Sequence, residues 1–584
     1  MSATLARIVD RSQRLVRDFV ARQTRSEMRQ PRSLDPVGAG GAFQEFLARL
    51  VSNPVTLLEA QTRFWRDQAL LWHSFTQRAL GADSSPIITP GEDDRRFGGE
   101  SWETNPVFDY IKQSYLLVSR YAFDCVEGVE GLDAHSARKV AFWTRQFVDA
   151  LSPTNFAVTN PEVLQRTMDT GGENLLKGLS NLLEDLEAGK GQLRIKMTAA
   201  DKFELGENIA VTPGRIVYQN ELMQLIQYTP STHTVYKTPL LIIPPWINKY
   251  YILDLRPRNS FIKWAVDQGH TVFVISWVNP DERLANKRFE DYVFEGPLAA
   301  LDAIEQATGE QRVNAIGYCL GGTLLATTLA YMKRTADERI KSATFFATMV
   351  DFARPGELGV FIDEEQLRNL EAQMKETGYL DGSEMAQTFN LMRANDLIWS
   401  FVINNYLMGK DPFPFDLLYW NSDSTRMPYT MHQFYLRNLY QDNLLREPDG
   451  IAIGDTPIDL RAIDTPTYVL STREDHIAPW TSTYAATQLY SGCVRFVLSK
   501  SGHIAGVVNP PAAHKYGYWT NEVLPGDADE WLAGAERHDG SWWLDWKKWI
   551  RRYQGKKIAA RQPGDGALDV IEDAPGEYVK VRAS

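Results

Sequence analysis

Cysteine is scarce in this sequence. The 584 residues contain three, Cys125, Cys319 and Cys493. Their wide separation excludes a disulfide framework and the paired spacing typical of a zinc site, and their low number fits the reducing cytosol. We therefore expect a cytoplasmic protein with no bound metal.

Long apolar runs are also missing. No stretch approaches 18 consecutive apolar residues, which predicts no transmembrane helix, and the N-terminus has no signal-peptide hydrophobic region. The net charge of −12 argues against a general nucleic-acid-binding protein. The remaining composition, with 44% hydrophobic and 23% charged residues, is typical of a globular protein, and the length predicts two domains.

The N-terminus departs from the acidic balance. Residues 1–32 carry eight Arg against Asp10, Asp18 and Glu27. Apolar residues recur there at roughly helical spacing: Leu5, Ile8, Val9, Leu15, Val16, Phe19 and Val20. The pattern predicts a basic amphipathic helix that binds an anionic or apolar surface, and a solvated terminal helix is the alternative.

The spacing of apolar residues divides the chain near residue 190. Residues 42–82 and 104–188 have apolar positions three and four apart, which predicts an all-helical N-terminal domain over 1–190. Over 191–584, short apolar runs bounded by turn signals alternate with helical segments. This alternation predicts a mainly parallel sheet covered by helices on both faces.

Residues 312–331 hold the clearest chemical signal. The apolar run Val313–Ile316 leads through G-Y-C-L-G-G into a helix of small and apolar residues. Strand, sharp turn and helix form the setting of a nucleophile elbow, and G-x-C-x-G is its G-x-S-x-G pattern with a thiol. The glycines let strand and helix approach, and the positive end of the following helix favours the thiolate. We predict that Cys319 is the nucleophile.

Two partners for Cys319 follow from the chain order nucleophile, acid, histidine of α/β-hydrolases. Asp475 lies in the turn after the predicted strand Thr465–Thr472. His503 follows the next predicted strand, Val494–Leu498. We predict that Asp475 is the acid and His503 the base.

Two neighbouring residues are set aside. His476 directly follows the predicted acid and is poorly placed to face the thiol, which favours a structural role. Cys493 precedes a strand without an elbow, and we interpret it as a small core residue.

An oxyanion formed at the thiol requires two backbone N–H groups. Leu320, directly after the nucleophile, supplies one. The second is expected from the P-P-W-I-N loop after the strand Leu240–Ile243, where the prolines lack N–H groups. Trp246 and Ile247 are the candidates, and we favour Ile247.

The alternation of strand and helix fails between about 351 and 460. This stretch is rich in Met, Trp, Tyr, Phe and Asn, and it is typical of helices and loops. An insertion at this point lies over the carboxyl ends of the strands, where open α/β sheets place their active sites. We interpret residues 351–460 as a helical cap over the thiol.

From about residue 95 onward, the sequence resembles the class I polyhydroxyalkanoate synthases. The resemblance is carried by residues 244–255, the G-Y-C-L-G-G box, R-E-D-H-I at 473–477, S-G-H-I-A-G-V-V-N-P-P at 501–511 and G-S-W-W at 540–543. It implies an α/β-hydrolase fold with a catalytic triad of Cys319, Asp475 and His503.

The resemblance also implies a reaction. It is the polymerisation of (R)-3-hydroxyacyl-CoA, with (R)-3-hydroxybutyryl-CoA the expected monomer, into a polyester with release of CoA. Acyl-CoA is then a substrate, and no cofactor is expected. The 3-hydroxyl of the next unit is deprotonated by His503 or by Asp475, and the sequence leaves both open.

Partners and alternatives follow from the same resemblance. It implies a homodimer that works at the surface of polyester granules, with granule-coating proteins as candidate partners. A cysteine-dependent thioesterase or hydrolase of the same fold is the alternative function, because fold and triad alone do not fix the acyl acceptor. A non-catalytic granule-surface protein is the third reading.

Overall fold

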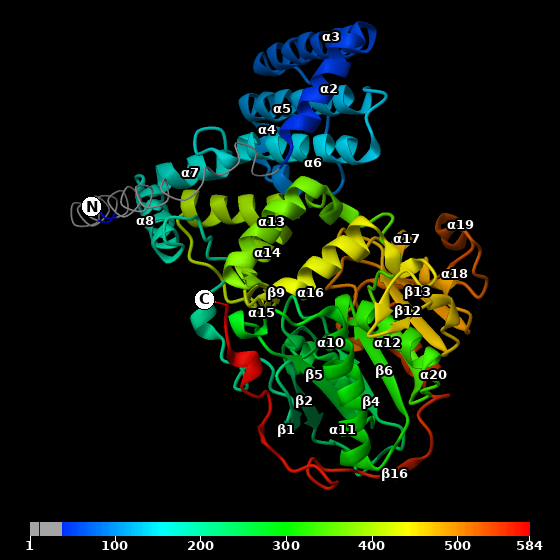
Figure 1. The fold of residues 1–584 in the computed structure, drawn as a ribbon. Coiled ribbons are helices and arrows are strands. Elements are labelled where there is room, and N and C mark those ends of the chain that lie inside the picture. The colour runs from blue at the N-terminus through cyan, green and yellow to red at the C-terminus, as the bar shows by residue number, and fades with distance from the viewer. Residues whose placement is uncertain (1–10, 12–13, 15–37, 584) are drawn as a thin grey trace. The chain divides into compact units, whose positions relative to one another are not determined.

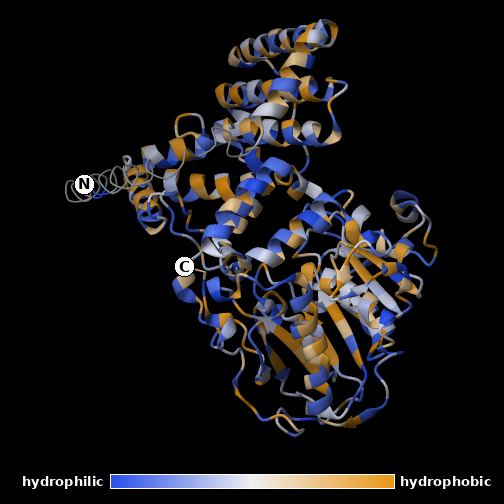
Figure 2. Ribbon diagram, viewed as in Figure 1, coloured by the Kyte–Doolittle hydropathy of each residue, from blue (hydrophilic) through white to orange (hydrophobic). Residues whose placement is uncertain are grey.

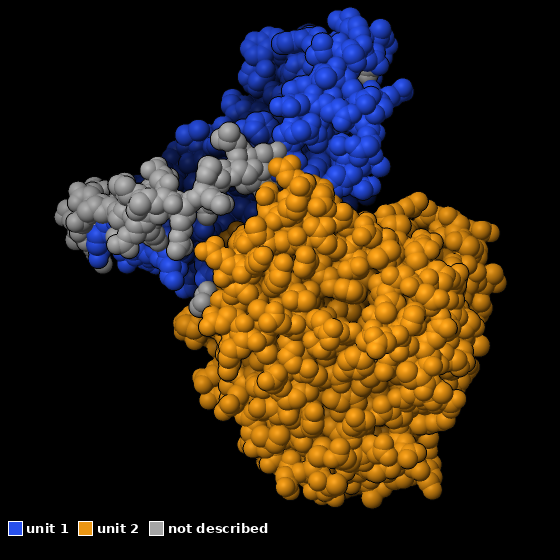
Figure 3. All heavy atoms as spheres, viewed as in Figure 1, with its two compact units in different colours: residues 1–199, 389–413 blue, residues 200–388, 414–584 orange. Residues whose placement is uncertain are grey.

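A computed structural model describes residues 11, 14 and 38–583 of the chain (Figure 1). The helix predicted at 1–32 therefore lies outside the described residues, apart from Arg11 and Arg14. The chain forms two compact units, coloured separately in Figure 3. The first comprises residues 1–199 with 389–413, and the second comprises 200–388 with 414–584. The first unit thus includes a segment from within the predicted cap.

The first unit is helical, as the sequence predicts. Its described α-helices are α2 (Gly40–Ser52), α3 (Pro54–Ala79), α4 (Ser101–Thr104), α5 (Pro106–Glu127), α6 (Ala134–Ala150), α7 (Pro161–Asp169) and α8 (Glu173–Ala188). Helices α5 and α7 begin at an Asn-Pro pair. Asn105 and Asn160 accept hydrogen bonds from N–H groups of the first turn, and the proline after each fits a position whose N–H would have no partner in the helix.

Residues 389–413 belong to the first unit because α8 holds them. Their π-helices are η9 (Asn395–Trp399) and η10 (Val402–Leu407). The side-chain amide of Asn174 donates to the carbonyl of Leu407 at 2.8 Å. The Tyr406 hydroxyl donates to the Asp185 carboxylate at 2.5 Å. Side chains of one helix thus fix the backbone and side chains of a segment more than 200 residues downstream.

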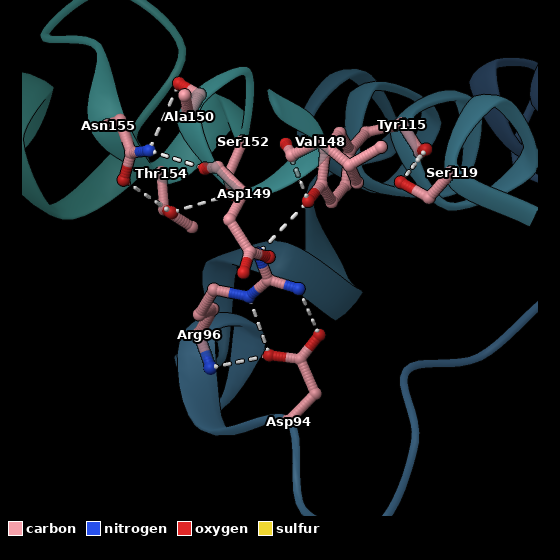
Figure 4. A network of polar contacts seen from close by, with 10 residues as sticks. All are labelled: Asp94, Arg96, Tyr115, Ser119, Val148, Asp149, Ala150, Ser152, Thr154 and Asn155. Atoms are coloured by element: carbon pink, nitrogen blue, oxygen red, sulfur yellow. Dashed lines mark hydrogen bonds and ion pairs between the residues drawn. The ribbon is translucent and has the colours of Figure 1, made fainter. Parts of the chain in front are cut away.

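A polar network joins the helices of this unit (Figure 4). The guanidinium of Arg96 donates to the Asp94 carboxylate at 2.8 Å, to Asp149 at 3.0 Å and to the Tyr115 hydroxyl at 2.9 Å. The Tyr115 hydroxyl donates in turn to the carbonyl of Val148 at 3.1 Å. One arginine thereby links a loop to both α5 and α6.

The second unit contains the sheet. Among the described residues, eleven strands pair in the order β15-β14-β13-β12-β7-β6-β4-β5-β2-β1-β17. The parallel strands are β4 (Leu240–Ile243), β5 (Val272–Trp277), β6 (Val313–Tyr318), β7 (Ile340–Phe346), β12 (Thr467–Thr472) and β13 (Val494–Ser499). The antiparallel strands are β1 (Gly214–Gln219), β2 (Met223–Tyr228), β14 (Gly517–Thr520), β15 (Glu536–Asp539) and β17 (Glu572–Asp573). This arrangement confirms the predicted α/β-hydrolase fold.

Short strands and helices complete the second unit. Two-stranded sheets are formed by β3 (Thr234–Tyr236) with β16 (Lys557–Ala559), β8 (Tyr379–Leu380) with β9 (Met427–Pro428), and β10 (Ala452–Ile453) with β11 (Thr456–Pro457). The helices are α9 (Phe261–Asp267), α10 (Phe289–Val293), α11 (Ala299–Thr308), α12 (Leu320–Arg334), α13 (Glu364–Thr377), α14 (Gly382–Met392), α15 (Asp416–Asn421), α16 (Tyr429–Phe434), α17 (Trp480–Thr483), α18 (Ala486–Leu489), α19 (Ala528–Ala533) and α20 (Trp543–Ile550). None of the described helices is both long and apolar enough to span a membrane.

The core of this unit lies along the parallel strands, whose residues are mostly hydrophobic in Figure 2. A tryptophan cluster extends it. Trp542 and Trp543 are fully buried, and their rings contact Phe261 and Phe346 at centroid distances of 4.9–6.1 Å. Burying an aromatic side chain of this kind stabilises the fold by about 1.5–3 kcal/mol. The cluster is thus part of the packed core.

The predicted cap is the insertion between β7 and β12. In the second unit it contains α13, α15, α16 and the π-helix η11 (Tyr435–Gln441). Tyr435 and Tyr440 on η11 are buried, and their rings meet edge to face at 5.2 Å. Burial raises the pKa of both hydroxyls, and negative charge at Cys319 raises both further. The cap therefore places two tyrosines near the thiol.

Candidate active site

Cys319 lies at a sharp turn between β6 and α12. Its backbone has φ 50° and ψ −119°, a conformation that costs a non-glycine residue about 1–3 kcal/mol. The neighbouring glycines lack a side chain where strand and helix come close together. A Cβ atom at Gly317 would lie 2.4 Å from the Cα of Gly322, and one at Gly321 would lie 2.1 Å from the carbonyl oxygen of Ile243. Strand and helix approach too closely for side chains, as the elbow pattern predicts.

Asp475 and His503 meet at the carboxyl ends of β12 and β13. The Nδ1 atom of His503 lies 2.7 Å from Oδ2 of Asp475. A carboxylate only accepts hydrogen bonds, so Nδ1 is the donor and Nε2 is left for the thiol. Both side chains are largely buried. The structure therefore brings together the two residues that the sequence predicts as acid and base.

Asp475 is held by four hydrogen bonds. Its Oδ1 atom accepts from the N–H groups of Ile477 and Ala478, each at 2.9 Å. Its Oδ2 atom accepts from the Thr472 hydroxyl at 2.9 Å and from His503. Two oxygens with four donors have no further capacity. The carboxylate is thus fixed in place and fully occupied.

The charges of these groups depend on one another. Burial alone would raise the pKa of Asp475, but the positive charge of His503 and the hydrogen bonds outweigh it and lower the pKa. Burial alone would lower the pKa of His503, but the charges of Asp475 and Cys319, with hydrogen bonds to both, raise it well above its ordinary value. The site thus favours the imidazolium form of His503 beside the Asp475 carboxylate.

The loop after β4 lies against the elbow. At Gly321, a Cβ atom would also collide with the carbonyl oxygen of Pro244, at 2.6 Å. Leu320 is the first residue of α12, so its N–H is one of those that have no partner within the helix. Trp246 is buried, and its ring contacts Tyr292 at 5.0 Å. The second oxyanion donor, Trp246 or Ile247, stays a prediction.

Of the two residues set aside, one differs from expectation. Cys493 is exposed, so its interpretation as a core residue is wrong. It lies in the turn ahead of β13, where its carbonyl accepts from the N–H of Thr467 while its side chain faces solvent. His476 is half-buried, and its carbonyl accepts from the N–H of Glu357. Within the described residues, no group of three His, Cys, Asp or Glu side chains is arranged to hold a metal.

Comparison with known proteins identifies the family. Residues 93–265 match the family described as the poly-beta-hydroxybutyrate polymerase (PhaC) N-terminus, and residues 239–510 match the alpha/beta hydrolase fold. The chain is 53% identical to the poly(3-hydroxyalkanoate) polymerase subunit PhaC of Rhizobium meliloti, over 91% of this chain and 87% of that protein. The chain belongs to the poly(3-hydroxyalkanoate) polymerase family.

Two further family members show similar coverage. The poly(3-hydroxyalkanoate) polymerase of Methylorubrum extorquens is 51% identical over 91% of this chain and 88% of its own. The polymerase subunit PhaC of Cupriavidus necator is 42% identical over 92% of this chain and 90% of its own. The resemblance read from the motifs is confirmed, and it extends closer to the N-terminus than residue 95 suggested.

One support of this polymerase-family site was not predicted from the sequence. The hydroxyl of Tyr318, directly before the thiol, donates to the carbonyl of His503 at 3.1 Å. The two rings stack at a centroid distance of 5.6 Å and an interplanar angle of 25°. Tyr318 therefore holds the imidazole on one face. The position of Tyr318 in the G-Y-C-L-G-G box is the feature of the sequence that could have indicated this role.

The second support comes from the start of α20. The indole N–H of Trp542 donates to the carbonyl of Gly506 at 2.9 Å, and that of Trp543 donates to Val507 at 3.0 Å. The Ser541 hydroxyl donates to the carbonyl of Asn509 at 2.5 Å. Three side chains thus fix the backbone that follows His503. The G-S-W-W motif marks these residues in the sequence, but not their partners.

Proposed function

We propose that this chain polymerises (R)-3-hydroxyacyl-CoA, with (R)-3-hydroxybutyryl-CoA the expected monomer, into a polyhydroxyalkanoate polyester with release of CoA. One observation carries the proposal. A thiol stands at a nucleophile elbow, beside a histidine paired at 2.7 Å to a buried carboxylate, in a chain 53% identical to a poly(3-hydroxyalkanoate) polymerase. We propose that Cys319, His503 and Asp475 act as a catalytic triad.

The first half-reaction forms an acyl-enzyme. His503 takes the proton of Cys319, and the thiolate attacks the thioester carbonyl of the acyl-CoA. The N–H of Leu320 and that of Ile247 or Trp246 stabilise the oxyanion. The intermediate collapses, the bond to CoA sulfur breaks, and the CoA thiolate leaves with the proton from His503. One thioester replaces another, so the step is nearly balanced in energy.

The second half-reaction extends the polyester. The 3-hydroxyl of another acyl unit loses its proton to a base and attacks the acyl-enzyme carbonyl, which forms an ester and frees the thiol. His503 and Asp475 were both open as the base. The four hydrogen bonds that Asp475 accepts favour His503, because the carboxylate has no free position for a further proton donor. We assign His503 as the base of both steps.

The acceptor must be a hydroxyl rather than water, since water would make the enzyme a thioesterase. The buried pair Tyr435 and Tyr440 supports exclusion of water, because both rings belong to the cap and lie near the thiol. We further propose that acyl-CoA is the only small molecule required, and that the enzyme acts as a homodimer at cytoplasmic polyester granules, with granule-coating proteins as partners.

Incubation of the purified protein with (R)-3-hydroxybutyryl-CoA tests the proposal. Polymer and CoA are expected. Free 3-hydroxybutyrate and CoA would instead make the protein a thioesterase, and no CoA would make it non-catalytic. Cys319→Ala should abolish CoA release while the protein stays folded, and Cys319→Ser should be severely impaired because a hydroxyl is the weaker nucleophile. Cys493→Ala is the matched control, since that thiol is exposed and lies at no elbow.

A further inference from the structure

A buried lysine occupies the loop after β4. The side chain of Lys249 is 2% exposed, and its ammonium lies 2.8 Å from the carboxylate of Asp423, which is also 2% exposed. The ammonium donates to the backbone carbonyls of Val579 at 2.6 Å and Val581 at 2.8 Å. The Lys249 ammonium is thus hydrogen-bonded to two backbone carbonyls and paired by charge with one carboxylate.

The carboxylate partner comes from the cap, which binds this loop at two other points. The N–H of Thr425 donates to the carbonyl of Ile247 at 2.9 Å. The indole N–H of Trp420 donates to the carbonyl of Lys249 itself at 2.7 Å. Residues on either side of Asp423 therefore hold the backbone of the same loop.

The two carbonyls belong to residues 579–582, which we name the tail segment. This segment is anchored independently of the lysine. The side-chain amide of Asn279 donates to the carbonyl of Val581 at 3.2 Å, and the guanidinium of Arg582 donates to the hydroxyl of Tyr419. Loop, cap and tail segment thus converge on one ammonium, although the tail carbonyls lie 330 and 332 residues from Lys249 in the chain.

The loop fixed in this way is the one that adjoins the elbow. Its first residue, Pro244, contacts Gly321, and its carbonyl accepts from the indole N–H of Trp277 at 2.8 Å. The loop contains both candidates for the second oxyanion donor, Trp246 and Ile247. Its residues belong to no regular strand, so its backbone depends for its conformation on partners outside the loop.

A buried ion pair is not an efficient way to stabilise a fold, because apolar residues of similar volume often serve as well. An ammonium that donates to two fixed carbonyls and pairs with a buried carboxylate does what an apolar side chain does not do: it fixes the position of its own backbone. We propose that Lys249 is a positioning residue, which uses the cap and the tail segment to hold the 246–249 backbone where it stabilises the oxyanion at Cys319. This inference rests on the proposed acyl transfer.

The test compares three substitutions in the full chain. Lys249→Met removes the ammonium. Lys249→Met with Asp423→Asn removes it without leaving an unpaired buried carboxylate. Arg561→Met is the matched control, because Arg561 is a 12%-exposed cation paired at 2.6 Å to Glu310, near the amino ends of β4 and β6. Single-turnover CoA release, KM, the melting temperature and hydrogen exchange of the 246–251 amides are measured for each.

We expect Lys249→Met to slow the first acylation at least about tenfold at saturating substrate, with KM changed less than about threefold, because the loop acts on the transition state. Exchange at 246–251 should rise. Arg561→Met should lose melting temperature yet acylate within about twofold of the wild type. The double variant should regain melting temperature but stay slow, because the carbonyl of Val579 lacks its Lys249 donor and that of Val581 keeps only Asn279.

Each contrary outcome has one meaning. If the double variant regains its acylation rate together with its melting temperature, Lys249 is only structural and the inference is overturned. The same holds if Lys249→Met acylates like Arg561→Met with unchanged exchange at 246–251. If the wild type releases no CoA, the proposed function fails instead. The exchange measurement needs no substrate, so it still reports on the role of Lys249 in that case.

Discussion

The two units of the chain both bury charged networks, but the networks end at different places. Around Arg96 in the helical unit, every described acceptor lies on a helix or on the loop beside it. In the hydrolase unit, the networks of Asp475 and Lys249 end on loops beside Cys319. The same kind of interaction thus stabilises one unit and aims reactive groups in the other. Substitutions should separate the two uses, because stability and acylation are measured independently.

The largest effect is expected at the triad. His503→Gln removes the proton acceptor and should lower the first acylation about 10²–10⁴-fold, while the protein stays folded. If Asp475 works only through His503, Asp475→Asn should lose the same first acylation. Single-turnover CoA release measures both. An Asp475→Asn variant that releases one CoA at the wild-type rate and then stalls would contradict our assignment and give Asp475 the elongation step.

The charge coupling of this pair predicts a pH dependence. The pKa of His503 is raised above its ordinary 6.5, and that of Asp475 is lowered below its ordinary 3.8. Their contribution to the free energy of unfolding is therefore complete between about 3.8 and 6.5. It is lost as the pH rises through the folded pKa of His503, or falls through that of Asp475. Asp475→Asn should flatten this profile in urea unfolding, and identical profiles would refute the coupling.

The indole clamp on the histidine loop should show a smaller effect. Trp542→Phe keeps the aromatic packing but removes one of the two donors to the buried carbonyl of Gly506, which keeps the Ser499 hydroxyl, at a cost of about 0.5–1.5 kcal/mol. A shift of the loop should slow acylation about tenfold, less than the roughly 10²-fold of a 1 Å displacement. Trp531→Phe is the control, because among the described residues its buried indole N–H has no partner. Equal rates for the two variants would refute the clamp.

In the helical unit, the comparison predicts lost stability with preserved chemistry. Arg96→Met leaves Asp94 and Asp149 without their shared cation. We expect a cost of about 2 kcal/mol, below the roughly 3–5 kcal/mol of a fully buried pair, because 21% of the Arg96 side chain is exposed. Acylation per folded molecule should stay within about twofold of the wild type. A tenfold loss in acylation, measured beside a thermal melt, would show that this network also serves the reaction.

The smallest effect on acylation is expected from removal of residues 1–32. The truncated protein should acylate at Cys319 as the full chain does, but partition less to polyester granules or show a longer lag before polymerisation. An Arg-rich helix is attracted to negative charge, and its apolar face is buried on arrival. Comparing soluble and granule-bound fractions tests this. Unchanged partitioning with an unchanged lag would make the segment a solvated terminal helix.

The parts of the site that chain order determines were predictable from the sequence. The proposed nucleophile, acid and base lie in the turns after β6, β12 and β13, so Cys319, Asp475 and His503 can be picked out by reading turns after apolar runs. The fold class follows from the same alternation of strand and helix. The glycines of the elbow were predictable because a nucleophile elbow brings strand and helix close together, although Gly321 meets Ile243 and Pro244 rather than a neighbour in the chain.

What could not be predicted depends on contacts between distant segments. The partners of Trp542 and Trp543 lie 36 residues away, and neither their spacing nor their type indicates which carbonyls they bind. The sequence around Lys249 gives no sign that it differs from an ordinary loop lysine. Its burial depends on the cap and the tail segment, which lie far from it in the chain. The interpretation of Cys493 as a core residue was wrong, because its side chain points outward from the turn ahead of β13. Hydrophobicity alone does not reveal this direction.

The late position of the tail segment in the chain also determines when the loop can be anchored during synthesis. A ribosome reaches Val579 330 residues after Lys249, which is roughly 17–66 s at about 5–20 residues per second. By then Cys319, Asp475 and His503 have all been translated. A nascent chain therefore holds every reactive side chain before the carbonyls that anchor its loop exist. If Lys249 positions the loop as proposed, the loop reaches its final conformation only after residues 579–582 have been translated.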